Sequence, residues 1–137
     1  MIDLMLAAVL LQGVADPCQA AETAETLRDG CPQWRFMRAN DVGRGYIDPA
    51  SVRRDGDIIE IMTRTVAIRA IAGGVRSFTV RLRIDCAART ALPLHYVGYD
   101  AVGVQVYERR ETERVVNPAP GSVFEVLLGE YCRTGQS

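Results

Sequence analysis

Lysine is absent from this chain of 137 residues, and histidine and tryptophan each occur only once. Without lysine the chain cannot form a nucleotide-binding P-loop, because the lysine of that loop reaches the phosphates. His95 is the only imidazole, and no G-x-S-x-G motif supplies a serine nucleophile for it. The four cysteines form no C-x-x-C pair and lie far from His95 in sequence, so no zinc site is indicated. These absences predict a protein that is not an enzyme and has no cofactor or metal, in which His95 is structural.

Neither sign of charge is in excess. Sixteen arginines stand against 17 Asp and Glu residues, and the formal net charge is −1. We therefore expect neither nucleic acid nor an anionic membrane as a partner. Hydrophobic residues make up 48% of the chain and charged residues 24%, which is typical of a folded globular protein, and the length suits a single domain.

The one long apolar run lies at the beginning of the chain, in residues 4–14 (LMLAAVLLQGV). A membrane-spanning helix needs about 20 residues, so this run is too short to be one. It matches the apolar region of a secretory signal peptide, which small residues follow. Residues 1–15 are therefore predicted to be a signal peptide, with cleavage after Ala15 or after Ala20. We expect an exported protein, in the periplasm or at the cell surface, whose mature chain has no transmembrane segment.

Four cysteines suit an oxidising compartment. Residues 16–33 contain two of them and are predicted to be an N-terminal helix or a linker. In a helix, Cys18 and Cys31 would lie roughly 20 Å apart at the helical rise per residue. A disulfide needs Cα atoms within about 7 Å of each other. The helix and a Cys18–Cys31 bridge therefore exclude each other, and the sequence does not choose between them.

From Trp34 onward the pattern indicates β-strands. The clearest strand is residues 77–85, where apolar and polar side chains alternate strictly. We expect one face of this strand to be buried, with Phe78, Val80, Leu82 and Ile84. The other face is expected to be wet, with Ser77, Thr79, Arg81, Arg83 and Asp85. Further strands are predicted at residues 57–67, 92–99 and 102–109, with turns at residues 54–57, 72–74 and 99–103.

The end of the chain predicts a helix. Ser122 and Glu125 match a capping box, and the residues that follow place one apolar stripe at helical spacing, formed by Phe124, Leu127, Leu128 and Tyr131. No crossover helix fits between the strands, so the sheet should be antiparallel. The predicted fold class is α+β: a single antiparallel β-sheet, a meander of about five to six strands, with the C-terminal helix packed on one face.

Cys86 continues the inward series of its strand, and Cys132 follows the last apolar residue of the helix. Both thiols are therefore expected to point towards the seam between helix and sheet. They form either a disulfide, which would close a long loop, or two buried free cysteines that pack as small apolar groups.

Several short motifs run along the chain in a fixed order. They are Trp34, residues 46–56 (YIDPASVRRDG), Ile84-Asp85-Cys86, Tyr99-Asp100 with Gly103, Pro120-Gly121-Ser122 and Cys132. In these motifs the chain resembles the surface-adhesin protein E-like family over residues 34–132, which leaves residues 133–137 as a tail. The resemblance implies an exported bacterial envelope domain with an antiparallel sheet and a C-terminal helix. It also implies that Cys86 and Cys132 correspond to the paired cysteines of the family.

Arginines on two neighbouring strands are the one candidate binding surface. Arg81 and Arg83 face outward on the clearest strand, and Arg64 and Arg69 lie on the strand before it. Arginines at this spacing suit an anionic polymer or the carboxylates of a partner protein. The alternative is an ordinary solvated face, on which these side chains pair with Glu60 or Asp85 across the strands.

We therefore expect an exported bacterial envelope domain without catalytic activity, which acts as a binding module similar to surface adhesins. Its ligand would be a protein or an anionic polymer. The alternative is a periplasmic structural or interaction protein that forms a homodimer through a sheet edge.

Overall fold

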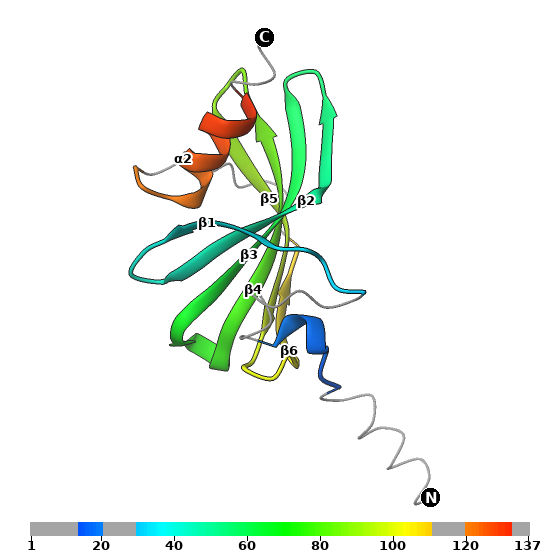
Figure 1. Ribbon diagram of the computed structural model, residues 1–137, viewed down its shortest axis with the longest axis vertical. Coiled ribbons are helices and arrows are strands. Elements are labelled where there is room, and N and C mark those ends of the chain that lie inside the picture. The colour runs from blue at the N-terminus through cyan, green and yellow to red at the C-terminus, as the bar shows by residue number, and fades with distance from the viewer. Residues whose placement is uncertain (1–13, 21–29, 111–119, 133–137) are drawn as a thin grey trace, which may run out of the picture.

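Six strands form one antiparallel sheet, in which every strand pairs with the next one along the chain (Figure 1). The computed structural model describes residues 14–20, 30–110 and 120–132. The predicted antiparallel meander of five to six strands is confirmed. The strands are β1 (Arg35–Ala39), β2 (Gly43–Asp55), β3 (Ile58–Ile71), β4 (Val75–Asp85), β5 (Thr90–Tyr99) and β6 (Gln105–Arg109).

Two tight turns join the long central strands. Gly56 adopts a φ of 60° in the turn between β2 and β3, where the sequence predicted a hairpin. A single 3-10 turn, η3 (Ala72–Gly74), joins β3 to β4, and both of its glycines have a positive φ. Such backbone conformations are open to glycine because it has no Cβ atom. The glycines therefore let the central strands fold back directly onto one another.

One face of the sheet, which we call the helix face, carries the main hydrophobic core. The C-terminal segment lies across it as α2 (Val123–Leu127), which continues into a π-helical turn, η4 (Leu128–Cys132) (Figure 1). Buried side chains of β2, β3 and β4 pack there against Leu127 and Leu128 of this segment. The strand residues are Ile47, Ile59, Ile61, Val80, Leu82 and Ile84. The predicted position of the helix on the apolar face is thus confirmed.

Two local features fix this helix. The Ser122 hydroxyl accepts a hydrogen bond from the Glu125 amide at 3.2 Å, as the capping box predicted. The Glu125 carboxylate accepts from the amide of Gly121 at 3.2 Å, one residue before the position that a capping box would use. At the far end, Cys132 forms a disulfide with Cys86, and their Cα atoms are 5.2 Å apart. The helix is therefore held at both ends.

The opposite face of the sheet is partly covered by an N-terminal segment, residues 14–20, which we call the strap. It contains the 3-10 turn η1 (Pro17–Gln19), blue in Figure 1. Ala15 forms an isolated β-bridge with Val104, and Cys18 forms a disulfide with Cys31 across 5.4 Å between Cα atoms. Residues 21–29, over which the alternative helix was predicted, lie outside the described residues. Of the two alternatives that the sequence left open, the Cys18–Cys31 disulfide is the one observed.

The strap corrects one prediction about the sheet. Ser77 and Thr79 on β4 were expected on a wet face, but their exposed fractions are 0% and 7%. The Ser77 hydroxyl donates a hydrogen bond to the Gln19 carbonyl of the strap at 3.3 Å. We call the whole of this side of the sheet the strap face. Its half around Ser77 and Thr79 is therefore buried by a segment that the strand pattern could not reveal.

Candidate functional site

The predicted arginine surface is not continuous, because Arg64 is buried. Its exposed fraction is 1%, and its guanidinium donates to the carbonyls of Cys18 and Ala20 at 3.0 and 2.8 Å. Burial lowers the pKa of Arg64, and the nearby Tyr46, Tyr99 and Asp16 oppose this shift. The placement of Arg64 on an exposed face was therefore wrong, since the strap covers it. Arg64 is a structural anchor for the strap.

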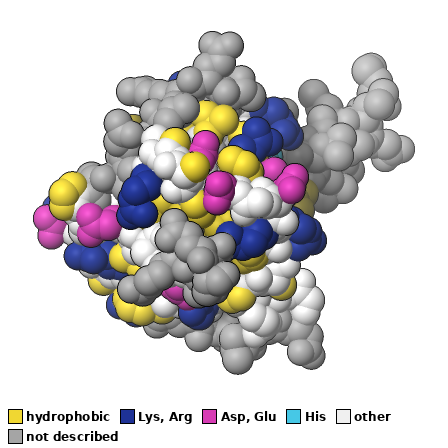
Figure 2. Space-filling view, turned by 90° about the horizontal axis from the view of Figure 1, so that it is seen from above, with side chains coloured by type: hydrophobic (Ala, Val, Ile, Leu, Met, Phe, Trp, Pro, Cys, Tyr) yellow, Lys and Arg dark blue, Asp and Glu magenta, His cyan; other side chains and the backbone are white. Residues whose placement is uncertain are grey.

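The other three arginines are exposed but do not gather. Arg83 pairs with Glu60 directly across β3 and β4, with 3.5 Å between Nη2 and Oε2, as in the solvated-face alternative. Arg81 lies opposite Met62 and His95 in the sheet register. Arg69 lies in the stretch of β3 where the pairing with β4 is interrupted. Figure 2 likewise shows arginine and carboxylate side chains interspersed on one face of the molecule.

His95 also has a partner that the sequence did not identify. Its Nε2 lies 2.6 Å from Oε2 of Glu108 on the neighbouring strand β6. Within residues 14–20, 30–110 and 120–132, no group of three or more His, Cys, Asp or Glu side chains is placed to hold a metal ion. In the same part of the chain, no helix is long and apolar enough to cross a membrane. The structural role that we assign to His95 is that of a cross-strand partner for Glu108.

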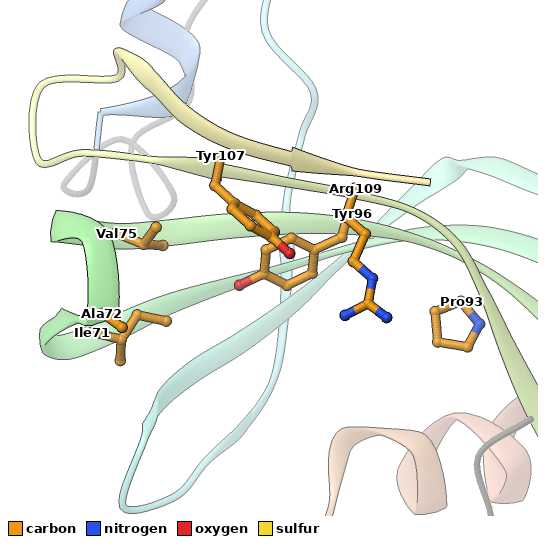
Figure 3. Close-up of a pocket in the computed structure, with 7 residues that line it drawn as sticks. All are labelled: Ile71, Ala72, Val75, Pro93, Tyr96, Tyr107 and Arg109. Carbon is orange, nitrogen blue, oxygen red and sulfur yellow. The ribbon is translucent and has the colours of Figure 1, made fainter. Parts of the chain in front are cut away.

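An apolar pocket lies on the helix face, beside the part that α2 covers. Its volume is about 450 Å³, within the range of small-ligand sites. We call it the tyrosine pocket, because rings from the neighbouring strands β5 and β6 form its centre (Figure 3). Its lining residues are Ile71, Ala72, Val75, Pro93, Tyr96, Tyr107 and Arg109.

A row of three aromatic rings runs along the sheet, and two of them, Tyr96 and Tyr107, line this pocket. Phe78 stacks on Tyr96 with ring centroids 5.0 Å apart, and Tyr96 meets Tyr107 edge to face at 5.4 Å. These separations are in the favourable range for aromatic pairs. Burial, and then Tyr107, raise the pKa of Tyr96 above its ordinary value, so its phenol stays neutral at physiological pH. Tyr96 therefore presents a neutral ring whose phenol group is a polar handle.

Gly98 of β5 leaves room for two of the side chains that line the pocket. In the sheet register it lies opposite Phe78 on one side and Tyr107 on the other. A Cβ atom at this position would lie 2.9 Å from a methyl carbon of Val75 and 3.3 Å from Cβ of Tyr107. The absence of a side chain at Gly98 therefore lets two of the lining side chains, Val75 and Tyr107, approach the strand closely.

The pocket is open to solvent, and four of its seven lining residues are exposed. Tyr107 is 44% exposed and Ile71 is 39% exposed. Figure 3 shows Arg109 reaching down beside the tyrosine rings on the side of Pro93. Such a surface can accept an apolar or aromatic group and orient it by hydrogen bonds to the phenols.

Sequence reasoning missed this pocket although both of its strands were predicted. Tyr96 and Tyr107 lie in the predicted strands 92–99 and 102–109, but only the register of β5 and β6 shows that they meet. The turn η3 then brings Ile71, Ala72 and Val75 to the same place. One usable signal was Gly98, a glycine inside a strand, which often marks a place where another group approaches the backbone closely.

A family model described as surface-adhesin protein E matches residues 34–133. Among solved structures, the chain is similar to protein E of Haemophilus influenzae, at 15% identity over 92% of this chain and 96% of that chain, with a TM-score of 0.53. A second crystal form of that protein gives 14% identity, coverage of 91% and 98%, and a TM-score of 0.56. Protein E from non-typeable Haemophilus influenzae is 15% identical over 80% of this chain and 82% of that chain, with a TM-score of 0.52. No curated protein sequence matches the chain significantly. The structural likeness, at these identities, concerns the fold.

Proposed function

The chain belongs to the surface-adhesin protein E family, and we propose that it is a non-catalytic binding module of the bacterial envelope that holds a partner protein through the tyrosine pocket. The observation that carries this proposal is the pocket itself, an open apolar hollow with Tyr107 44% exposed at its rim. Tyrosine and arginine are the residues that dominate binding energy at protein interfaces. The pocket combines both with an aliphatic floor.

Two further features support a place outside the cytoplasm. All four cysteines form disulfides, which persist in oxidising compartments. The chain also begins with the apolar run that a secretory signal peptide has. A domain in this location meets macromolecules from outside the cell, as the description of the family as surface adhesins suggests.

The proposal is tested with the purified protein and a panel of immobilised extracellular matrix proteins and acidic polysaccharides. For a matrix protein that the wild-type chain binds, we expect Tyr107→Ala to weaken binding about tenfold, the effect of losing an interface anchor. The matched control is Phe36→Ala, because Phe36 is 46% exposed and lies on β1 at the opposite edge of the sheet. Equal binding by Tyr107→Ala and Phe36→Ala would overturn the proposal.

Two alternatives give different results. If the exposed arginines hold an anionic polymer instead, replacing both Arg81 and Arg83 with Ala abolishes binding to the acidic polysaccharides and Tyr107→Ala does not. If the protein is a periplasmic structural or interaction domain, protease does not cut it on intact cells. Pairing of two copies through a sheet edge would also make its mass in solution depend on concentration.

A further inference from the structure

Hydrogen bonds of the strap backbone hold the strap against the folded domain. The Asp16 amide donates to the carbonyl of Gly103 at 2.9 Å, and the Asp16 carboxylate accepts from the Cys18 amide at 2.9 Å. The Cys18 and Ala20 carbonyls in turn accept from the buried guanidinium of Arg64. A buried charge of this kind needs its acceptors, because an ion without partners is expensive to bury. The domain therefore requires residues 16–20.

The turn between β5 and β6 is shaped to receive the strap. Gly103 has a φ of 94°, and a Cβ atom there would lie only 2.1 Å from the Asp16 carbonyl oxygen. The same Cβ atom would lie 3.0 Å from the Ala20 nitrogen. Only glycine allows so close an approach of two backbones. The position of Gly103 is thus fitted closely to the strap backbone, both at Asp16 and at Ala20.

The disulfide gives a second, independent reason to keep these residues. Cys31 is joined to Cys18, and the remaining two cysteines are joined to each other. Cleavage after Ala20 would remove Cys18 and leave Cys31 as an odd thiol in an oxidising compartment, where such a thiol invites wrong pairing.

We propose that the Ala15–Asp16 bond is the processing site of this protein, and that the mature chain begins at Asp16. Gly13 and Ala15 provide the small residues that a signal peptidase needs at positions three and one before the cut. In the reaction water adds across the amide, so that Ala15 gains a carboxylate and Asp16 gains an amino group. The new amino nitrogen is the atom that already contacts the Gly103 carbonyl, so the contact survives as a charge-assisted hydrogen bond.

The test is the intact mass of the mature protein. The full chain is expressed with its own leader in a bacterium, carries a C-terminal tag, and is treated with iodoacetamide without reduction. We expect a mass that begins at Asp16 and carries no alkylation. A mass that begins at Ala21 with one alkylated thiol overturns the proposal. So does a retained leader, or a lipid attached to Cys18.

A variant separates the choice of bond from the efficiency of export. Ala15→Arg removes the small residue before the proposed cut and leaves Ala20 unchanged. We expect the uncleaved precursor to accumulate. Undiminished formation of a chain that begins at Ala21 would show that the cut after Ala20 is the natural one.

The single tryptophan reports on the folded domain directly. Trp34 is 9% exposed, and the central guanidinium carbon of Arg64 lies 5.9 Å from the centroid of the Trp34 ring. We compare two chains made without a leader, one that begins at Asp16 and one that begins at Ala21. The shorter chain should show a red-shifted Trp34 emission and stronger quenching by acrylamide. Identical emission and quenching in the two chains would contradict the role of the strap.

Discussion

The two faces of the sheet are covered in different ways. On the helix face, apolar side chains of β2, β3 and β4 pack against an amphipathic helix. On the strap face, the cover is a short segment with little regular structure, and polar side chains hold it by hydrogen bonds to its carbonyls. One disulfide ties each cover to the domain. The comparison shows that a single sheet can be covered on one side mainly by hydrophobic packing and on the other by a segment that polar side chains hold through hydrogen bonds.

The two faces also differ in their expected roles, because the helix face carries the proposed binding pocket and the strap face does not. The helix face holds the core and, beside it, the open tyrosine pocket. The strap face holds the buried Arg64 and the exposed pair of Arg83 with Glu60. Changes on the strap face should therefore alter the stability of the domain and leave the tyrosine pocket intact.

Removal of either disulfide should have the largest effect on stability, and the effect should differ between the two faces. The Cys86–Cys132 bridge closes a loop of 46 residues and the Cys18–Cys31 bridge one of 13. The chain-entropy relation gives about 4 kcal/mol for the longer loop and about 3 kcal/mol for the shorter one. Replacing each pair with alanines should lower the free energy of unfolding in that order, measured by urea denaturation. The reverse order would mean that the strap, and not the helix, is the main cover of the sheet.

Gly103 tests how closely the strap must fit. Gly103→Ala places a methyl group against the Asp16 backbone and imposes a positive φ on alanine. The matched control is Gly56→Ala, because Gly56 also has a positive φ but nothing lies within 4 Å of its Cβ position. We expect Gly56→Ala to cost about 1 kcal/mol from backbone strain alone. Gly103→Ala should cost about 2 kcal/mol more, because overpacking is added. Equal losses in thermal unfolding would show that the strap moves aside freely.

Arg83→Gln should have the smallest effect. The pair of Arg83 with Glu60 is 3.5 Å long, and both side chains are a third or more exposed. Exposed pairs of this kind contribute about 0.2–1 kcal/mol and are screened by salt. The free energy of unfolding should fall by no more than that, and the difference should shrink at 1 M NaCl. A loss above that range, or one that salt does not reduce, would assign Arg83 a larger role on the strap face.

Much of the fold was visible in the sequence because it follows from local rules. Strict alternation in residues 77–85 correctly predicted the burial of Val80, Leu82 and Ile84. The hairpin at Gly56 and the cap at Ser122 were also predicted, since turn and cap chemistry involves neighbouring residues. The candidate site was less accessible. The pocket depends on the register of β5 with β6 and on the position of η3, which no local pattern specifies.

By itself, the sequence determined an antiparallel meander and a capped helix on its apolar face. Only the tertiary structure decided that Arg64, Ser77 and Thr79 are buried. It also decided that Cys18 pairs with Cys31 and that Tyr96 meets Tyr107. The physical reason is that alternation reports which side chains share a face. What covers that face depends on contacts between segments that lie tens of residues apart in the chain.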